Sequence, residues 1–223
     1  MKAIVLLSGG LDSMVALGIA VKKKRDCLCI SIDYGQRHII ELTAARKIAE
    51  FFRVPHKIFK VDPQTFSDSV LIGNGGKVPK NRSQQEMIEG GIPSTYVPAR
   101  NTLFLAYALG QAEIWNAKEI YVGFNALDAY GYPDCRPAFV QAFQNLINVA
   151  TKQSVTGQPP QLIVPLIEWD KHEIVRQGRL LNLPLKMSFS CYDPTQEGNA
   201  CLECDACRLR QAALKEDEGI RKG

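Results

Sequence analysis

The sequence contains no long apolar run. Nowhere in its 223 residues does a stretch approach the roughly 18 consecutive apolar residues that are needed to cross a bilayer. The opening "MKAIVLL" has one lysine and a short apolar run, but no small-residue cleavage site follows it, so it does not fit a secretion signal. We therefore expect a cytoplasmic protein with no membrane partner.

An excess of charge of one sign is missing as well. The chain has 27 lysines and arginines against 23 aspartates and glutamates, a formal net charge of +4. So mild a balance does not by itself indicate a nucleic-acid partner. With 46% hydrophobic and 22% charged residues, the composition is that of an ordinary globular protein, and the length suffices for one core with a small appendage.

The first sixty residues alternate between strand and helix patterns. A continuous apolar run, typical of a strand buried on both faces, is followed by apolar residues at helical spacing, and the alternation then repeats. This order predicts an α/β fold with an open parallel sheet covered by helices. The expected strands are 3–7, 27–34, 56–61, 119–124 and 162–167, and the expected helices are 11–24, 39–52, 102–116, 138–150, one beginning near Asp170 and one at 205–216.

Two irregular stretches and a distinct tail interrupt this alternation. Residues 62–99 and 125–137 are rich in glycine, proline and polar side chains, and the first is long enough to predict a functional loop such as a lid. Asp170, with Glu173 three residues later, predicts a helix start of the capping-box type. We divide the chain into an α/β domain, 1–185, and a metal-binding segment, 186–223, packed on it.

The stretch "SGGLDS", residues 8–13, stands directly between the first expected strand and the first expected helix. Two glycines allow a ligand to approach the backbone closely, and the unpaired N–H groups of a helix's first turn attract anions. Asp12 suits such a site only if a cation accompanies the anion, as Mg²⁺ accompanies phosphates. The lysine of the Walker A loop is absent, which excludes that class of phosphate site. The alternative is an ordinary turn with a serine helix cap.

Four of the seven cysteines crowd near the end of the chain, with the spacing Cys-x9-Cys-x2-Cys-x2-Cys. Four thiolates can close a tetrahedron around Zn²⁺ and leave no position for water. We therefore expect one structural zinc per chain, with an iron–sulfur cluster as the alternative; disulfides are less expected without an export signal. The expected metal ligands are Cys191, Cys201, Cys204 and Cys207.

The other three cysteines are expected to be structural. Cys27 and Cys29 alternate along an expected strand and are predicted to be buried core thiols. Cys135 lies in the second irregular stretch, where we predict a structural loop thiol, with a nucleophile as the alternative.

The loop 8–13 resembles the pyrophosphate loop of the N-type ATP pyrophosphatases, whose pattern Ser-Gly-Gly-x-Asp-Ser it matches at every fixed position. Members of that superfamily cleave ATP between the α and β phosphates and adenylate an oxygen of their substrate. The resemblance implies a Rossmann-like sheet of the adenine nucleotide alpha hydrolase type. It also implies that "DYGQRH" (33–38) lies beside the adenosine, with Asp33 and Arg37 as candidate contacts; solvated loop residues are the alternative.

Further motifs narrow the resemblance. Together with the loop and the four cysteines, "DYGQRH", "YVPARN" (96–101) and "GYPDCRP" (131–137) resemble the family of 7-cyano-7-deazaguanine synthases over essentially the whole chain. The resemblance implies a carbon–nitrogen ligase of queuosine biosynthesis. Such an enzyme converts 7-carboxy-7-deazaguanine, ammonia and two ATP into the nitrile through an adenylated carboxylate and an adenylated amide. ATP, Mg²⁺ and Zn²⁺ are the implied cofactors, no nucleic acid is required, and a homodimer is expected.

The same resemblance implies roles for individual residues. The expected catalytic residues are Asp12, acting through Mg²⁺, Ser13, Arg100 and Lys171. Asn101 is expected to contact ATP beside Arg100. Asp134 is expected to bind the amine edge of the deazaguanine, and Arg136 its carboxylate. The alternatives are a solvated helix lysine at Lys171 and an internal loop salt bridge between Asp134 and Arg136. The expected phosphate contacts are Ser8, Gly9, Gly10, Leu11, Asp12 and Ser13.

Two other functions are open at this point. One is a tRNA-modifying enzyme of the same superfamily, acting by sulfur transfer or amidation; sulfur transfer needs a reactive thiol near ATP, for which Cys135 is the candidate. The other is a non-catalytic zinc-ribbon binding module, which would have no use for an intact phosphate loop. The length leaves no room for the amidotransferase domain of glutamine-fed synthetases.

Overall fold

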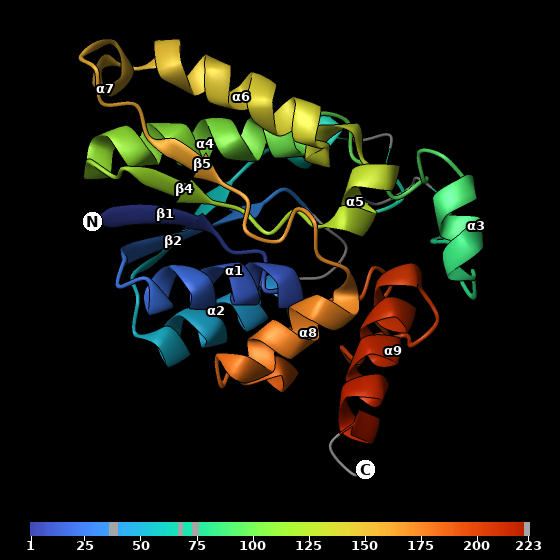
Figure 1. The fold of residues 1–223 in the computed structure, drawn as a ribbon. Helices are drawn as coiled ribbons and strands as arrows, with labels where there is room; N and C mark the ends of the chain where they lie inside the picture. The colour runs from blue at the N-terminus through green and yellow to red at the C-terminus, as the bar shows by residue number, and fades with distance from the viewer. Residues whose placement is uncertain (36–39, 67–68, 73–75, 221–223) are drawn as a thin grey trace.

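A five-stranded parallel sheet forms the centre of the protein (Figure 1). The computed structural model describes residues 1–35, 40–66, 69–72 and 76–220. The strands run in the order β3-β2-β1-β4-β5, and each neighbouring pair is parallel, which confirms the predicted α/β fold. Their bounds are β1 Lys2–Leu6, β2 Asp26–Asp33, β3 His56–Lys60, β4 Glu119–Tyr121 and β5 Gln161–Ile163.

Helices cover both faces of this sheet (Figure 1). One face carries α1 Leu11–Lys22, α2 Ile40–Phe52 and α8 Lys171–Leu180, and the other carries α4 Arg100–Trp115 and α6 Pro137–Ala150. None of the helices in the described part of the chain is long and apolar enough to span a bilayer. The remaining helices are α3 Gln84–Glu89, α5 Ala126–Gly131, α7 Lys152–Val155 and α9 Asp205–Ile220, with 3-10 turns at Pro63–Phe66, Pro133–Cys135 and Leu185–Met187.

Burial from both sides explains the composition of the central strands. Ala3 and Val5 of β1 belong to the core shared with α1, α2 and α8, whereas Ile4 between them belongs to the core shared with α4 and α6. Parallel strands covered in this way require apolar side chains in both directions. Cys27 and Cys29 lie in the first core, 2% and 0% exposed, which confirms their prediction as buried core thiols.

The chain turns to opposite faces of the sheet after β1 and after β4, although these strands are neighbours. β1 leads into α1 on one face, and β4 leads through α5 into α6 on the other. Where two connections diverge in this way, they leave a crevice beyond the carboxyl ends of the strands. The loop 8–13 therefore lies at the position where open α/β sheets bind their ligands.

The strands β4 and β5 are shorter than predicted. They were expected to run to 124 and 167, but they end at Tyr121 and Ile163. Pro165 has no N–H group with which to continue the ladder. Gly123 packs so closely on the start of α1 that a Cβ there would lie 2.9 Å from the carbonyl carbon of Asp12. The approach of α1 thus draws the chain after β4 away from the sheet.

Residues 125–137 are ordered as helical turns, which corrects the expectation of an irregular stretch. Asn125 caps α5, because its Oδ1 accepts hydrogen bonds from the N–H groups of Leu127 and Asp128, each at 3.0 Å. Asp170 caps α8 by accepting from the N–H of Glu173 at 2.8 Å, as predicted. The Glu173 carboxylate pairs instead with Arg176, at 2.6 Å.

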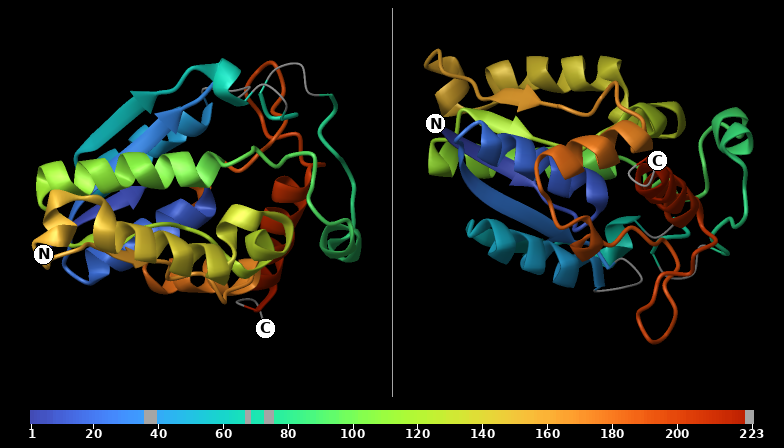
Figure 2. Two further views of the ribbon diagram at one scale, coloured as in Figure 1. Left: turned by 90° about the horizontal axis from the view of Figure 1, so that it is seen from above. Right: turned by 60° about the horizontal axis from the view of Figure 1, so that its bottom comes forward.

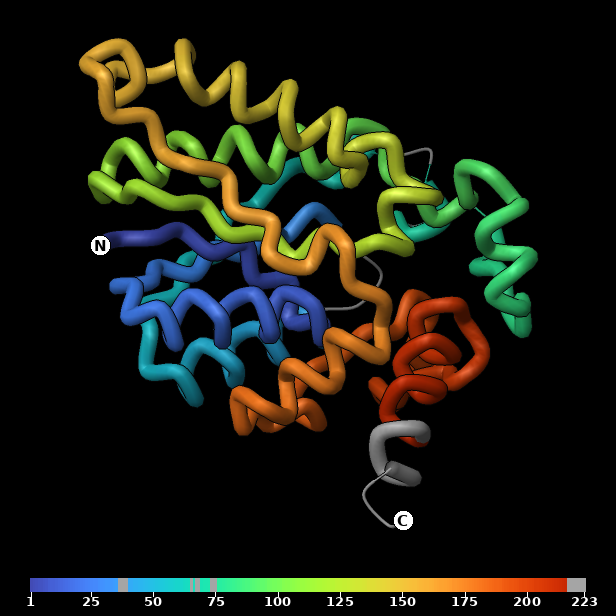
Figure 3. The backbone as a smooth tube through the Cα atoms, in the orientation of Figure 1, coloured from blue at the N-terminus to red at the C-terminus, as the bar shows by residue number. Residues whose placement is uncertain are grey.

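The long insert and the cysteine tail share a third core. Val70, Val78 and Val97 of the insert pack in one cluster with three of the four tail cysteines. Arg82 pairs with Asp205 at the start of α9, and the N–H of Asn81 donates to the carbonyl of Glu203 at 2.8 Å. Figures 2 and 3 show the green segment with α3 beside the red tail. The insert is therefore attached to the tail.

Candidate active site

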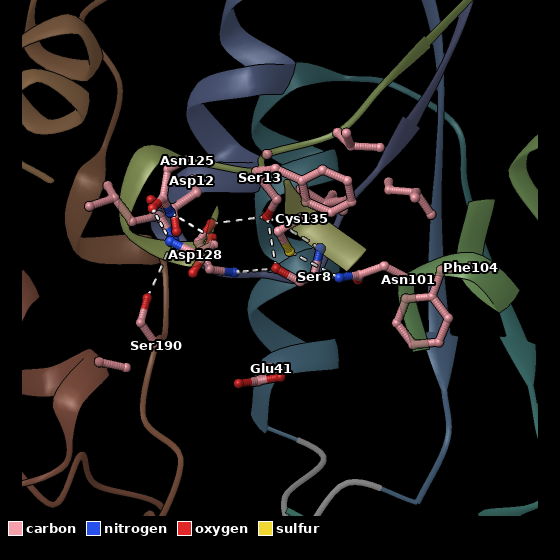
Figure 4. Close-up of a pocket in the computed structure, with 18 of the residues that line it drawn as sticks. Ser8, Asp12, Ser13, Glu41, Asn101, Phe104, Asn125, Asp128, Cys135 and Ser190 are labelled. Atoms are coloured by element: carbon pink, nitrogen blue, oxygen red, sulfur yellow. Dashed lines mark hydrogen bonds between the residues drawn. The ribbon is translucent and has the colours of Figure 1, made fainter. Parts of the chain in front are cut away.

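The loop 8–13 joins β1 to α1 and lines a cavity at the switch point of the sheet (Figure 4). Ser8 Oγ lies 3.0 Å from Ser13 Oγ, and Ser13 Oγ donates to the carbonyl of Gly10 at 3.0 Å. The N–H of Ser8 donates to Ser13 Oγ at 3.2 Å. These bonds hold the loop around the first turn of α1, where unpaired N–H groups and the helix dipole favour an anion.

The two glycines of the loop have different tasks. Gly9 has a φ of +90°, and a Cβ there would lie 2.1 Å from the carbonyl oxygen of Glu41 and 2.9 Å from the nitrogen of Ala45. Both atoms are backbone atoms of α2, so Gly9 lets the loop pack against that helix. Gly10 has an ordinary φ of −77° and lines the cavity itself.

Asp12 and Lys171 form an ion pair in the cavity. Lys171 Nζ lies 2.7 Å from Asp12 Oδ1 and 2.8 Å from Oδ2, with the two side chains 16% and 25% exposed, respectively. Burial opposes the charge of Lys171, but the carboxylates of Asp12 and Asp128 outweigh it, and the pKa of Lys171 is raised. Lys171 is therefore not a solvated helix lysine; it holds a positive charge beside the loop 8–13.

Asn125 and Asp128, which were not among the predicted site residues, complete this charged corner. Asn125 Nδ2 donates to Asp128 Oδ2 at 2.7 Å, and both residues line the cavity. Burial raises the pKa of Asp128 to about 6, although the Lys171 ammonium acts in the opposite direction. Their position directly after β4, the neighbour of β1, is the signal that could have found them.

Arg100 and Asn101 open α4 at another wall of the cavity. Arg100 Nη1 donates to the hydroxyl of Tyr34 at 3.4 Å, and its guanidinium carbon lies 5.9 Å from the centre of that ring. Asn101 Nδ2 donates to Cys135 Sγ at 3.1 Å. The cavity thus contains a guanidinium held against an aromatic ring, a geometry that preserves its charge under partial burial.

Three of the predicted site residues have other positions. Asp134 Oδ2 accepts a hydrogen bond from the N–H of Asn101 at 3.0 Å, in the first turn of α4. Arg136 Nε donates to the carbonyl of Ala129 at 3.2 Å, at the end of α5. Asp33 accepts from the N–H of Gly35 at 3.3 Å, and Arg37 lies outside the described residues. Asp33, Asp134 and Arg136 are absent from the described lining of the cavity.

Cys135 is a buried thiol. It is 3% exposed, and burial raises its pKa well above the usual range. A neutral thiol that accepts a hydrogen bond from Asn101 is a poor nucleophile, because the thiolate is the reactive form. The geometry therefore supports the structural role and weakens the nucleophilic alternative.

The four tail cysteines converge. Their Sγ atoms all lie within 4.8 Å of one another. Tetrahedral Zn–S bonds of about 2.3 Å place sulfurs about 3.8 Å apart, so the set fits a single zinc ion. A multi-iron cluster binds its cysteines through separate irons and needs a wider spread of sulfurs. The cluster is formed by Cys191, Cys201, Cys204 and Cys207.

The cysteine segment also contacts the loop 8–13. The N–H of Phe189 donates to the carbonyl of Gly9 at 2.9 Å, and the N–H of Leu11 donates to Ser190 Oγ at 3.4 Å. Ser190 directly precedes Cys191, the first of the four converging cysteines. Arg210 of α9 donates to the carbonyl of Leu185 at 2.8 Å and lines the cavity. The tail therefore forms one wall of the candidate active site.

The cavity thus brings together most of the residues predicted from the sequence and several that were not. The predicted residues in its lining are Ser8, Gly10, Leu11, Asp12, Ser13, Arg100, Asn101 and Lys171. The residues that sequence reasoning missed include Tyr34, Glu41, Asn125, Asp128, Ser190, Tyr192 and Arg210.

A parallel sheet of this order, with a glycine-rich loop after its first strand and a cavity at its switch point, defines an α/β protein with the fold type of the ATP pyrophosphatases. Comparison with known families gives the particular branch. The profile described as "Queuosine biosynthesis protein QueC" matches residues 2–218, and the chain belongs to that family.

Curated relatives agree with the profile. The 7-cyano-7-deazaguanine synthase of Anaeromyxobacter dehalogenans is 48% identical over 216 residues, which cover 96% of this chain and 92% of that protein. The protein of the same name from Saccharophagus degradans is 45% identical over 216 residues, 96% of this chain and 93% of that one. The predicted family and the predicted class of enzyme, an ATP-dependent carbon–nitrogen ligase, are therefore confirmed.

Solved structures are more distant. The NMN synthetase from Francisella tularensis is 17% identical, with a TM-score of 0.49 over 97% of this chain and 76% of that one. A likeness of this degree supports no conclusion about function.

Proposed function

We propose that the chain converts 7-carboxy-7-deazaguanine and ammonia into 7-cyano-7-deazaguanine in queuosine biosynthesis, with two ATP cleaved to AMP and pyrophosphate. The observation that carries the proposal is the phosphate loop, which opens at the switch point into a cavity that also holds Lys171 and Arg100. The names of the curated relatives supply the product, 7-cyano-7-deazaguanine, and the acid, ammonia and ATP are taken from the family resemblance.

The chemistry needs two activations of the same carbon. A carboxylate oxygen of the substrate attacks the α-phosphorus of ATP, pyrophosphate leaves, and the acyl adenylate forms. Ammonia then attacks the acyl carbon, AMP leaves, and a proton is lost to give the amide. In the second round the amide oxygen is adenylated, and loss of AMP with the remaining nitrogen protons leaves the nitrile. Oxygen departs each time as part of AMP, a far better leaving group than oxide.

The protein's part in this chemistry is mainly positioning and charge stabilisation. Ser8, Gly10 and Ser13, with the first turn of α1, would hold the β and γ phosphates. Asp12 carries a carboxylate in the cavity beside that turn, which suits Mg²⁺; the ion would neutralise phosphate charge. Lys171, paired with Asp12 and directed into the same corner, would contact a phosphate as charge moves to the leaving pyrophosphate.

Zinc has a structural part in the proposal. Four cysteines that converge on one point leave no ligand position open for water or substrate. The hydrogen bond that Phe189 donates to the loop and the one that Ser190 accepts from it connect this site to the loop 8–13. The expected homodimer stays a prediction from the family resemblance, and the cytoplasmic location stays a prediction from the sequence composition.

The rival functions make different predictions for one experiment. The chain is incubated with ATP, ammonium and either 7-carboxy-7-deazaguanine or tRNA, and AMP and product masses are followed by mass spectrometry. The proposal expects the nitrile and two AMP for each nitrile with the acid, and no AMP with tRNA. Asp12→Asn should abolish both products, whereas Asp26→Asn, at an exposed position, should not.

Three results would contradict the proposal. AMP release with tRNA alone would favour a tRNA-modifying enzyme. Because the Cys135 thiol is buried, the transferred sulfur would then have to come from another source. No AMP with either substrate would favour the binding module. A single AMP with an accumulating amide would refute the second adenylation.

A further inference from the structure

Three carboxylates line the described part of the cavity, and they differ in their partners. Asp12 is paired with Lys171, and Asp128 accepts a hydrogen bond from Asn125 Nδ2 at 2.7 Å. Glu41, in the first turn of α2, receives no hydrogen bond from the residues that the structure describes, and it stands alone in Figure 4.

A carboxylate in this position is energetically costly. Glu41 is half-buried, and even partial removal of a charged group from water without hydrogen-bond donors disfavours the ionised form. Burial accordingly raises the pKa of Glu41 to about 7, against the attraction of Arg100, which acts to lower it. Donors brought by a ligand would offset this cost, because two N–H groups could bind the two carboxylate oxygens.

The surroundings indicate what kind of ligand supplies these donors. Arg100 is already close enough to stabilise the charge of Glu41, so a second cation would meet the repulsion of the guanidinium. Neutral N–H donors meet no such repulsion. Tyr34 and Phe104 line the same cavity, with ring centres 5.3 Å apart, and give this part of its wall an aromatic surface, which suits a planar ring.

A guanine-type ring has the matching donor pattern. Its N1–H and its exocyclic 2-amino group are adjacent and both donate, so a carboxylate can accept from the two together. Adenine presents a ring acceptor at N1 beside its amine, and a carboxylate would repel that lone pair. Asp134, the carboxylate expected for this task, is engaged by Asn101.

We propose that Glu41 binds the N1–H and 2-amino edge of 7-carboxy-7-deazaguanine and selects this ring over adenine. The proposal rests on the proposed function, because the substrate is taken from it. Glu41 is then a specificity-determining residue, which acts on binding of the ring and not on ATP.

Direct binding measurements test this role independently of turnover. Calorimetry gives the Kd of the wild-type chain, Glu41→Gln and Glu41→Ala for the acid, for its analogue without the 2-amino group, and for ATP. Glu50→Gln is the matched control, since Glu50 is exposed on the same helix. Thermal unfolding confirms that each variant is folded, and nitrile formation is measured separately.

We expect Glu41→Gln to weaken binding of the acid about 10- to 100-fold, the usual range for hydrogen bonds to a charged group, and to leave the Kd for ATP unchanged. The wild-type chain should discriminate against the 2-deamino analogue by a similar factor, and Glu41→Gln should lose most of that discrimination. Glu50→Gln should match the wild type in every measurement.

Several outcomes would overturn the inference. Equal weakening of acid and ATP by Glu41→Gln would make Glu41 a structural residue of the cavity. Unchanged discrimination against the analogue in a folded Glu41→Gln protein would refute the contact. Tight, Glu41-dependent binding without nitrile formation would refute the proposed function and leave the inference standing. No binding of the acid by the wild-type chain would refute both.

Discussion

Replacing Gly9 by alanine tests the packing of the loop 8–13 against α2. With a φ of +90°, Gly9 has a conformation that L side chains rarely adopt, and the new Cβ would lie 2.1 Å from the carbonyl oxygen of Glu41. It would also lie 2.9 Å from the nitrogen of Ala45. Neither atom can turn away as a side chain would, because both belong to the backbone of α2. The loop or the helix must therefore move.

The cost can be separated into two parts. A non-glycine residue in so unfavourable a conformation costs about 1–3 kcal/mol, and overpacking against a rigid neighbour adds about 1–3 kcal/mol. We expect Gly9→Ala to lower the free energy of unfolding by about 4 kcal/mol. Gly157 has a φ of +83° with nothing within 4 Å, so Gly157→Ala should show the conformational part alone, about 1–3 kcal/mol.

A third glycine variant should raise the free energy of unfolding instead of lowering it. Gly110 lies within α4 in open space, and Gly110→Ala should stabilise the protein by about 1 kcal/mol. Urea unfolding of the three variants measures these differences in stability, and calorimetry measures the Kd of each variant for ATP. Gly9→Ala should weaken ATP binding, and the other two should not. A Gly9→Ala protein as stable as Gly157→Ala, with wild-type ATP affinity, would refute the packing of the loop on α2.

Three further predictions follow from the charges and the cysteine segment. Lys171→Met should lower the rate of AMP release about 100-fold or more, because a cation beside the phosphates is lost. Lys152→Met, at an exposed position, should leave this rate unchanged. Equal rates for the two variants would show that Lys171 has no part in the chemistry. Burial raises the pKa of Asp128 to about 6, so this group costs stability progressively as the pH rises from about 4 to about 6. Asp128→Asn should therefore stabilise the protein more at pH 7.5 than at pH 4.5 in urea unfolding, and a pH-independent difference would contradict this. Removal of the cysteine-bound metal with a chelator should weaken ATP binding about 10-fold, because the metal site holds the segment that makes two hydrogen bonds with the loop. Added zinc should restore the affinity for ATP. An unchanged affinity would show that the tail does not influence the loop.

Local patterns were sufficient for most of the fold. β1, α1, β2, α2 and β3 begin and end close to their predicted bounds, because apolar periodicity and chain order are properties of adjacent residues. The ends of β4 and β5 were not predictable, since the packing of Gly123 on α1 depends on residues more than a hundred positions away. The helical turns of 125–137 have a local signal, the Asn125 cap, which the glycine- and proline-rich composition concealed.

The sequence by itself determined the family and the two local motifs. Contiguous residues make the anion loop 8–13, and closely spaced cysteines make the metal site, so both could be recognised from spacing alone. Tertiary structure decided which side chains share the cavity. It paired Lys171 with Asp12, directed Asp134 and Arg136 to helix ends, and left Glu41 facing the cavity without a donor from the described chain. These outcomes depend on which helices meet at the switch point, and side chains that are distant in sequence reach one another only after the sheet has formed.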